Sequence, residues 1–316
     1  MAVDITRLTG ALGAVVTGVD LRQPLSEDGY SQLFTALMDH QVLFFRDQDL
    51  SDDEQLELAS AFGPVSVYPL TALMDHQVLF FRDQDLSDEQ QLELASRFGP
   101  VSLYPLTALM GGSRRVSYIE DTEQSPPDAD GWHTDVTWIS DPPAAAFLSA
   151  RVIPDCGGDT LWASLYRAYD LLSPAMQRVC DGLTVRHWYG PAFEAAIGRT
   201  LGEETRGKLA AAFPPVTHPL VRPHPITGRK ALFVAGGFMH EIVDMRPEES
   251  QLLLRYLESL VDNPNAQCRW RWHPNDLAIW DERCTNHRAL SDHYPRARVM
   301  RRCTVDGPRL RPEQPG

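Results

Sequence analysis

The sequence predicts a mainly β fold, a sandwich or barrel that carries helices on its outside. Short runs rich in β-branched and aromatic residues recur along the chain, and glycine and proline separate them. Only a few segments place apolar residues at the spacing of a helix. The C-terminal part is the richest in strands, with candidates at 267–272, 277–280 and 298–305. Short strands with tight turns and a few helices are typical of sandwiches and barrels.

The composition is that of an ordinary globular protein without a nucleic-acid surface. The chain has 316 residues, of which 43% are hydrophobic and 23% charged, and its formal net charge is −14. This length fits one large domain or two modest ones. The acidic balance and the lack of a lysine- or arginine-rich run argue against nucleic acid and anionic membranes as partners. A small anionic substrate remains compatible, because local arginines decide binding in a pocket.

Cysteine usage indicates a reducing compartment. The five cysteines are odd in number and include no C-x-x-C pair, so a disulfide framework is not expected. The start of the chain lacks a cationic segment, and nowhere does an apolar run reach the length of a membrane span. We therefore expect a cytoplasmic protein with no signal peptide and no membrane span, and we expect it to form a homo-oligomer.

The segments on either side of residues 35–110 predict strands and helices in mixed order. Residues 3–20 read as strand–turn–strand, and a helix begins at about Ser26 and runs to about Asp39. A polar loop at 111–130 surrounds one strand, and residues 187–212 are expected to form a mobile, partly helical lid. The other predicted strands are 116–119, 144–152, 216–221 and 231–234, and the predicted helices are 164–171, 174–182 and 247–262.

Between these segments lies a tandem duplication. Residues 35–70 recur as 71–106 with 32 of 36 positions identical, and each copy predicts a strand, a helix and a short extended piece. Solenoid repeats normally diverge and number three or more, so two nearly identical copies indicate a recent duplication of one unit. Only one copy can fill a single strand position of a parent fold. We expect that copy to be 71–106, within a single domain that spans residues 1–316.

Three side chains far apart in the sequence form a candidate metal site. His133 and Asp135 are two residues apart, and the β-branched and aromatic residues at 136–138 favour a strand there. Side chains two apart in a strand point the same way, so the imidazole and the carboxylate would converge. His287, which follows the apolar strand at 277–280, supplies a third ligand. Such a set forms the facial triad of non-haem Fe(II) or holds zinc in a tetrahedral site.

A carboxylate pocket is predicted beside this site. Arg298 and Arg302 are four residues apart on a predicted strand, so both guanidinium groups share one face. The planar fork of arginine matches a carboxylate in geometry and charge. Thr160 can add a hydroxyl donor to the same anion.

Taken in order, these motifs resemble the taurine dioxygenase family of Fe(II)- and 2-oxoglutarate-dependent oxygenases. The resemblance runs from the N-terminal strands to about Gly307 and is interrupted only by the extra copy. It implies a mainly β fold with flanking helices around a double-stranded β-helix core, a jelly roll of the cupin type. It also implies Fe(II), 2-oxoglutarate as a cosubstrate, and O2. The motifs that carry it are His133-x-Asp135, the turn Gly157-Gly158-Asp159-Thr160-Leu161-Trp162, Trp280-Asp281 with His287, and the Arg298/Arg302 pair.

The resemblance further implies a role for each of these residues. His133, Asp135 and His287 would be the metal ligands and the catalytic set. Arg298 and Thr160 would bind the distal carboxylate of 2-oxoglutarate, and Arg302 would bind the anionic group of the substrate. The aromatic side chains of Phe193 and Phe238 match substrate walls in the family.

Two positions depart from the family pattern. Where the family has a substrate-binding histidine, this chain has Tyr104, or Tyr68 if the first copy fills the strand position. A position that holds an amide in the family is Ala129 here. The polar contacts to the ammonium group of taurine are therefore expected to be lost. A less polar substrate that still bears an anion fits better.

We therefore expect a dioxygenase that hydroxylates a small anionic organic substrate, desulfonates or cleaves it where a leaving group is present, and releases succinate and CO2. Two alternatives stay open. A zinc-dependent hydrolase could use the same His-Asp-His site, but it leaves Arg298, Arg302 and Thr160 without a role. A catalytically impaired member of the family is the second alternative, because the duplication could disturb the core.

Two other patterns are expected to be structural. His218 and His224 lie on a proline-rich connection and have no acidic neighbour in the sequence. Residues 269–272 alternate arginine and tryptophan in the period of a strand, which indicates sheet packing rather than a platform for nucleic-acid bases.

Overall fold

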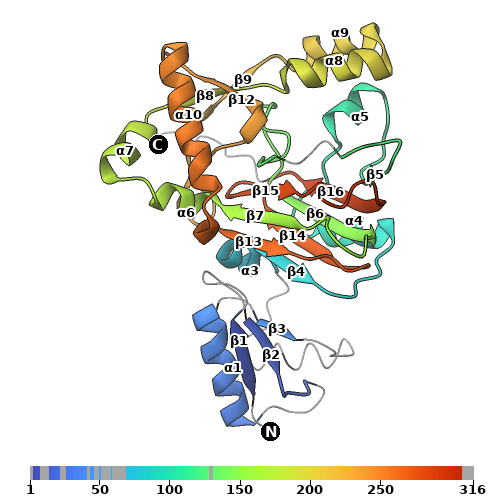
Figure 1. Ribbon diagram of the computed structural model, residues 1–316, viewed down its shortest axis with the longest axis vertical. Helices are drawn as coiled ribbons and strands as arrows, with labels where there is room; N and C mark the ends of the chain where they lie inside the picture. The colour runs from blue at the N-terminus through green and yellow to red at the C-terminus, as the bar shows by residue number, and fades with distance from the viewer. Residues whose placement is uncertain are drawn as a thin grey trace, which may run out of the picture. The chain divides into compact units, whose positions relative to one another are not determined.

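A computed structural model of the chain gives the fold (Figure 1). The structure describes residues 3–7, 14–21, 26–40, 43–45, 50, 58, 69–127 and 131–307. Contacts within the chain divide it into two compact units, residues 1–76 and residues 77–316, here called the N-terminal unit and the main unit. That the whole chain forms one domain stays a prediction.

The N-terminal unit contains a three-stranded sheet and the helix predicted from the sequence. β1 (Asp4–Arg7) pairs antiparallel with β2 (Ala14–Thr17), and β3 (Leu43–Phe45), the strand of the first copy, pairs parallel with β2. Helix α1 (Glu27–His40) begins where the Ser26 hydroxyl accepts a hydrogen bond from a backbone amide of the first turn. The short helix α3 (Pro69–His76) ends the unit. The buried apolar residues of the N-terminal unit include Val16, Leu21 and Leu33.

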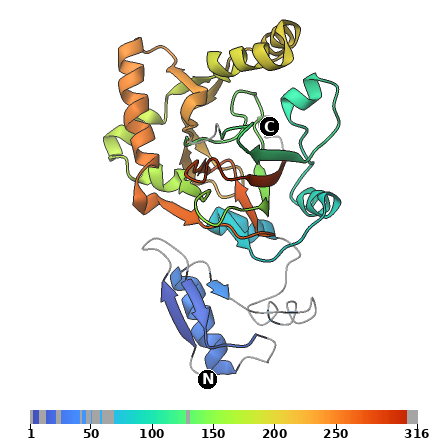
Figure 2. The same cartoon turned by 45° about the vertical axis from the view of Figure 1, so that its right-hand side comes forward.

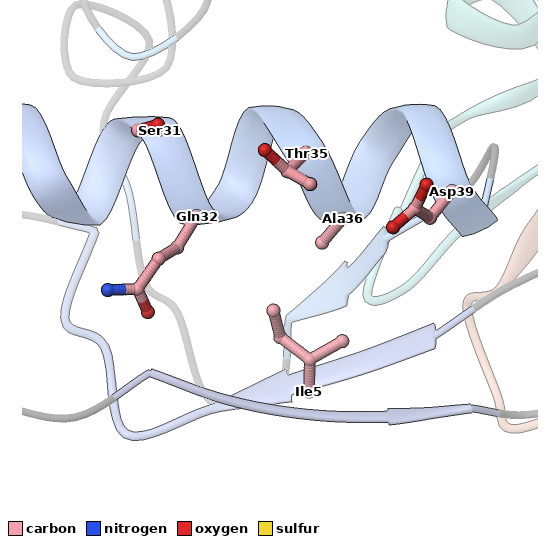
Figure 3. Close-up of a pocket in the computed structure, with 6 residues that line it drawn as sticks. All are labelled: Ile5, Ser31, Gln32, Thr35, Ala36 and Asp39. Atoms are coloured by element: carbon pink, nitrogen blue, oxygen red, sulfur yellow. The ribbon is translucent and has the colours of Figure 1, made fainter.

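A cavity of about 360 Å³ lies between α1 and β1 (Figure 3). Ile5 contributes its aliphatic side chain from the strand, and Asp39 is the one ionisable residue in the lining. Without an imidazole, a thiol or a second carboxylate, these lining residues offer neither a metal-ligand set nor a catalytic pair. The remaining lining residues come from the helix and are Ser31, Gln32, Thr35 and Ala36.

The main unit is built around a five-stranded sheet in which all neighbours are antiparallel. The strand order is β4-β14-β6-β16-β5. The two predicted strands 144–152 and 298–305 occupy central positions as β6 and β16, which explains why their side chains are mostly buried. The bounds are β4 Val78–Phe81, β14 Leu277–Asp281, β6 Ala145–Val152, β16 Arg298–Val305 and β5 Ser117–Asp121.

A second sheet, in the order β13-β7-β15, packs against the first through aromatic side chains. The ring of Trp162 on β7 lies 5.1 Å from Phe80 on β4 and 5.5 Å from Trp280 on β14, measured between centroids. Two antiparallel sheets packed face to face agree with the predicted mainly β fold, while the strand connectivity of a double-stranded β-helix stays a prediction. The bounds are β13 Gln267–Trp270, β7 Thr160–Ser164 and β15 Thr285–Ala289.

Two smaller sheets complete the strands of the main unit, and they pair in the orders β12-β8-β9 and β10-β11. β8 and β9 lead the chain into and out of the predicted lid, which forms the helix pair α8 (Gly190–Leu201) and α9 (Glu203–Ala212). The mobility of this lid stays a prediction. The bounds are β8 Thr184–His187, β9 Val216–Pro219, β10 Val221–Pro223, β11 Lys230–Leu232 and β12 Met239–Ile242.

Helices lie on the outside of the main-unit sheets, as the sequence predicts (Figure 1 and, turned by 45°, Figure 2). The apolar side of α10 contributes Leu254, Leu257 and Val261 to a large buried cluster, which α6 and α7 also enter. Among the described helices none is both long and apolar enough to cross a membrane. The bounds are α4 Asp88–Ser96, α5 Pro105–Leu109, α6 Leu165–Asp170, α7 Pro174–Cys180, η1 Gly236–Phe238, α10 Pro247–Val261 and η2 Pro264–Ala266.

The second copy of the duplication supplies β4 and α4 to the main unit. β4 pairs antiparallel with β14 at the edge of the five-stranded sheet. Just after β4, the guanidinium of Arg82 stacks on the Trp270 ring at 3.8 Å and forms an ion pair with Asp276. From α4, the fully buried Gln91 accepts a hydrogen bond from the Ser149 hydroxyl at 2.7 Å. The copy at 71–106 therefore provides an edge strand and a packed helix to the main unit, while its filling of the single strand position of a parent fold stays a prediction.

Candidate metal centre

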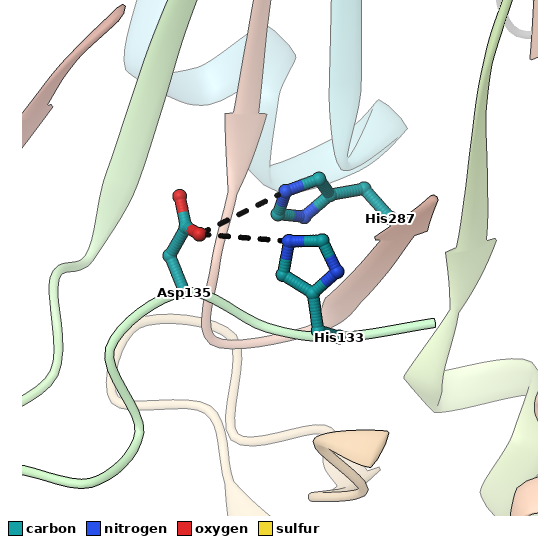
Figure 4. Close-up of side chains that lie close together, drawn as sticks. All are labelled: His133, Asp135 and His287. Atoms are coloured by element: carbon teal, nitrogen blue, oxygen red, sulfur yellow. Dashed lines mark ion pairs between the residues drawn. The ribbon is translucent and has the colours of Figure 1, made fainter. Parts of the chain in front are cut away.

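The three predicted metal ligands lie together at β15, the edge strand of the sheet β13-β7-β15 (Figure 4). Nε2 of His133 is 3.7 Å from Oδ1 of Asp135, and Nε2 of His287 is 3.9 Å from the same oxygen. One ligand atom from each residue lies within 4.8 Å of the other two. A single ion can therefore reach all three.

Backbone hydrogen bonds bring the two histidines together. His133 and His287 form an antiparallel bridge in which each amide donates to the other's carbonyl, at 3.0 and 2.8 Å. Between them, the Asn286 side-chain amide donates to the Thr134 hydroxyl at 2.7 Å, and this hydroxyl donates to the Thr285 carbonyl at 2.9 Å. The segment before Asp135 is thus fixed along β15 before any ligand binds.

The predicted strand at 136–138 is wrong, because residues 135–138 form a turn. Val136 has a φ of +56°, a conformation that β-branched residues rarely adopt. Contacts from outside the segment hold the turn. Nε2 of His218 lies 2.8 Å from the Thr137 carbonyl, and Nδ1 of His187 lies 3.0 Å from the Thr137 hydroxyl. Asp135 is the first residue of this turn and comes two residues after the β-bridge at His133.

The contacts and charges around the three ligands fit a divalent metal. Nδ1 of His133 donates to the Gly131 carbonyl at 2.8 Å, which leaves Nε2 on the side of Asp135. Burial, followed by the neighbouring His133, lowers the pKa of His287 to about 3. Burial alone would raise the pKa of Asp135, but Arg302 and the two histidines outweigh it and lower this pKa to about 2. Two imidazoles and one carboxylate match the donors of non-haem Fe(II).

Arg302 and Glu282 fix the orientation of Asp135. The Arg302 guanidinium donates to Oδ2 of Asp135 at 2.7 Å, which leaves Oδ1 on the side of the histidines. The Asp135 amide donates to Glu282 at 3.1 Å, and the Trp280 indole donates to the other oxygen of Glu282 at 2.8 Å. Burial and the charge of Asp135 raise the pKa of Glu282 well above its usual value. A second carboxyl group thus lies next to the site and accepts a hydrogen bond through each of its oxygens.

The sequence analysis missed Glu282. Its signal was present, because an acidic residue directly after a buried apolar strand needs a partner inside the protein. The neighbouring Asp281, the last residue of β14, has the same signal in the sequence, which did not distinguish the two.

The predicted carboxylate pocket places Arg298 and Thr160 side by side. Arg298 is 2% exposed and Thr160 is 1% exposed. The Arg298 guanidinium donates to the Thr160 hydroxyl at 3.3 Å and to the Gly158 carbonyl at 3.0 Å. Opposite Arg298 in the register of β5 and β16 lies Asp121, whose Oδ2 is 3.6 Å from the guanidinium. Two donors of the kind that bind a carboxylate are therefore held rigidly inside the main unit.

The predicted substrate contacts Tyr104, Phe193 and Phe238 all pack against one buried apolar cluster. This cluster includes Val136 and Trp138, which directly follow the ligand Asp135. The centre of the Arg302 guanidinium lies 6.0 Å from the centroid of the Tyr104 ring. The three aromatic side chains and Arg302 thus gather on the side of the site that carries this cluster. Tyr68 and Ala129 lie outside the described residues.

A second group of metal-binding residue types, His224, Asp281 and Cys284, already has internal partners. Nδ1 of His224 accepts from two backbone amides at 3.2 and 3.3 Å, and Nε2 donates to Asp281 at 3.1 Å. The guanidinium of Arg283 donates to both oxygens of Asp281, at 2.9 and 2.6 Å. This network joins β14 to the loop at 224, and it gives His224 the acidic partner that its neighbours in the sequence lack. His218 contacts the Thr137 carbonyl, and the structural role expected of both histidines stays a prediction.

Comparisons with known proteins identify the family of this chain. The family model "Taurine catabolism dioxygenase TauD, TfdA family" matches residues 4–73 and, separately, residues 69–304. The two matches divide the chain where the second copy begins.

Two curated relatives align over nearly the whole chain. The alkylsulfatase of Acinetobacter baylyi is 30% identical over 308 residues, which cover 96% of this chain and 84% of the relative. The alpha-ketoglutarate-dependent sulfate ester dioxygenase of Pseudomonas putida is 33% identical over 311 residues, which cover 97% of this chain and 90% of the relative.

A solved structure is also similar. The crystal structure of a taurine dioxygenase from Burkholderia xenovorans superposes with a TM-score of 0.64 and 28% sequence identity, covering 97% of this chain and 91% of that one. The family model, the relatives and this structure confirm the resemblance seen in the sequence. The chain belongs to the TauD, TfdA family and is a 2-oxoglutarate-dependent non-haem iron dioxygenase.

Proposed function

We propose that this enzyme uses Fe(II), 2-oxoglutarate and O2 to hydroxylate a small anionic organic substrate, with release of succinate and CO2. The observation that carries the proposal is the convergence of His133, Asp135 and His287 within 4.8 Å. The buried pair Arg298 and Thr160 supports it, because a zinc hydrolase would have no use for a second, separate carboxylate pocket.

The substrate classes that fit best are organic sulfate esters and aryloxy acids. Among the relatives that align over nearly the whole chain, two are named for alkyl sulfates and sulfate esters, and two are named for phenoxypropionate and 2,4-dichlorophenoxyacetate. We infer that Arg302 binds the anionic group, and that Tyr104, Phe193 and Phe238 contact the organic part. These aromatic side chains pack on an apolar cluster, which favours an alkyl or aryl group over the ammonium group of taurine.

Each residue has a defined task in this reaction. Bound iron would supply the activation of O2 and the oxidising power needed to break a C–H bond. His133, Asp135 and His287 would hold the metal, and Arg298 with Thr160 would orient 2-oxoglutarate through its distal carboxylate. Glu282 keeps the backbone of Asp135 in place, and the apolar cluster behind Val136 excludes water.

Hydroxylation next to a leaving group explains how such an enzyme cleaves its substrate. One oxygen atom of O2 enters succinate as 2-oxoglutarate loses CO2, and the other enters the C–H bond of the substrate. A carbon that then carries both a hydroxyl and a sulfate group is unstable. It expels sulfate, and the proton of the new hydroxyl leaves as a carbonyl compound forms.

Succinate release tests the proposal. Anaerobically purified protein receives Fe(II), 2-oxoglutarate and ascorbate, and air starts the reaction in the presence of alkyl sulfates, sulfonates or aryloxy acids. We expect succinate and a carbonyl product in equal amounts with at least one alkyl sulfate, and no turnover after His287→Ala. Substrate hydrolysis with zinc in the absence of O2 would instead show the alternative hydrolase. Absence of succinate from an iron-loaded protein would show an impaired member of the family.

A further inference from the structure

Trp272 lies in the same buried layer as the candidate carboxylate pocket. It is 2% exposed and follows β13, whose last residue, Trp270, pairs with Thr160 in the register of β13 and β7. The Trp272 indole donates to the Thr160 hydroxyl oxygen at 2.9 Å. The same oxygen accepts a second hydrogen bond, from Arg298 at 3.3 Å.

These two hydrogen bonds decide what Thr160 can offer to a ligand. Indole and guanidinium groups are donors only, and a hydroxyl has two acceptor lone pairs and one hydrogen. Because Trp272 and Arg298 occupy both lone pairs, the Thr160 hydroxyl can only donate in any further hydrogen bond. Among the described residues the hydroxyl of the 1% exposed Thr160 donates no hydrogen bond. A buried donor without an acceptor calls for an acceptor from the ligand.

We propose that Trp272 is a positioning residue that fixes Thr160 as a hydrogen-bond donor, so that the pocket accepts a carboxylate and rejects a carboxamide at the distal end of the cosubstrate. A carboxylate has only acceptors and satisfies both Thr160 and Arg298. A carboxamide would place its NH2 group against one of these two donors. This inference rests on the proposed use of 2-oxoglutarate.

The test compares two inert ligands that differ only at the distal group. N-oxalylglycine has the carboxylate and N-oxalylglycinamide the amide in its place, and neither is turned over. Their dissociation constants are measured by calorimetry on the anaerobic Mn(II)-loaded protein and on its Trp272→Phe variant. Loss of one hydrogen bond should weaken N-oxalylglycine about five- to tenfold. The preference for carboxylate over amide should fall by a similar factor, because the freed lone pair can accept from an amide NH2.

Trp162→Phe is the matched control. Trp162 is also a tryptophan of this layer, 2% exposed, and its indole nitrogen has no hydrogen-bond partner among the described residues. Its replacement removes similar ring volume without removing a hydrogen bond, so both dissociation constants should change less than about twofold. A preference that falls equally in Trp162→Phe would overturn the proposal, as would an unchanged preference in Trp272→Phe.

Two further variants keep the result interpretable. In a Thr160→Val background, Trp272→Phe should have no additional effect, because the hydroxyl that it orients is gone. If Trp272→Phe does not fold, benzothienylalanine at position 272 preserves the shape of the side chain and lacks the N–H. Failure of the wild-type protein to bind N-oxalylglycine at all would count against the proposed function. Binding without discrimination would count against the role of Trp272 alone.

Discussion

Two of the three ligands of the candidate metal centre, His133 and Asp135, have a second contact that fixes the atom they present, whereas Nδ1 of His287 is buried and has no hydrogen-bond partner among the described residues. The Gly131 carbonyl holds Nδ1 of His133, and Arg302 holds Oδ2 of Asp135. Such contacts set the tautomer and the orientation of metal ligands, and their loss typically weakens metal binding. Glu282 acts indirectly, because it accepts a hydrogen bond from the backbone amide of Asp135.

Glu282→Gln should weaken Mn(II) binding about tenfold. The glutamate accepts hydrogen bonds through both oxygens, from Asp135 and from Trp280. A glutamine has one acceptor oxygen, so its NH2 group must face one of these donors. Electron paramagnetic resonance of free Mn(II) measures the change. Glu120→Gln, at an exposed position of β5, serves as the control and should bind Mn(II) like the wild type.

Arg298→Lys should raise the KM for 2-oxoglutarate by more than about tenfold and leave Mn(II) affinity unchanged. Lysine keeps the positive charge but cannot form the planar two-point contact of a guanidinium. It also loses the hydrogen bond from Nε to the Gly158 carbonyl. Steady-state succinate formation measures this effect. Arg296→Lys, two residues away and exposed, is the control, and an equal KM for both variants would refute the assigned role.

At the scale of the elements, close backbone contacts hold the ligand-bearing loop. Gly236 in η1 has a φ of +53°, and a Cβ atom there would lie 1.9 Å from the carbonyl oxygen of Trp132. This contact involves backbone on both sides and cannot be relieved by a side-chain rotation. The segment that carries His133 is therefore clamped between η1 and β15.

Gly236→Ala should destabilise the protein by about 3 kcal/mol or more and weaken metal binding, because the new methyl group displaces the Trp132–His133 backbone. Chemical denaturation and Mn(II) titration measure the two effects. Gly237→Ala is a closely matched control, since a Cβ at that position meets no atom within 4 Å. A comparable loss of unfolding free energy in both variants would mean that any side chain in η1 destabilises the protein, whether or not it contacts the Trp132 backbone.

Asp281→Asn should destabilise the protein by about 3–5 kcal/mol at pH 7, because Arg283 would lose its buried partner charge. Burial alone would raise the pKa of Asp281, but hydrogen bonds from Arg283 and His224 outweigh it and lower this pKa below 3.8. A lowered pKa adds stability that is complete above pH 3.8 and is lost as the pH falls through the folded-state value. The gap in unfolding free energy between wild type and variant should therefore narrow below about pH 4. A gap that is constant with pH would exclude an ionised Asp281.

The sequence predicted elements and ligands better than it predicted the geometry between them. β6, β16 and α10 follow from local patterns of apolar residues, and His133, Asp135 and His287 follow from residue types that share one chemistry. The turn at 135–138 could not be predicted, because His187 and His218, far along the chain, hold a valine at positive φ. The contact of Trp272 with Thr160 depends in the same way on the pairing of β13 with β7, which no local pattern encodes.

At the scale of the whole molecule, the duplication produces two nearly identical strands, and each of them pairs with a different neighbour. β3 of the first copy pairs with β2, and β4 of the second copy pairs with β14. The family model matches the chain in two overlapping pieces, each of which contains one copy. We infer that in a relative without the duplication a single strand pairs with the counterparts of both β2 and β14. In this chain the duplication provides a separate strand for each of them.

Deletion of residues 71–106 should leave a folded enzyme that is at least as stable as the full chain. The remaining copy then pairs with β2 on one edge and with β14 on the other, so fewer strand edges stay open. Deletion of residues 35–70 gives almost the same protein, because the copies differ at only four positions. Both variants should melt in one transition at the same temperature. Aggregation of both would show that the second copy has become necessary for folding.

The mutual backbone bonds of His133 and His287 have a consequence for which ion the protein carries. Since the donor groups are already in place, little rearrangement accompanies loading, and the site has few means of choosing between ions of similar size. Affinity at nitrogen and oxygen donors rises from iron through cobalt to nickel and copper, so the biologically useful ion is not the tightest binder. Occupancy then depends on the supply in the cell, and protein prepared on a nickel column has to be stripped with a chelator before iron can enter.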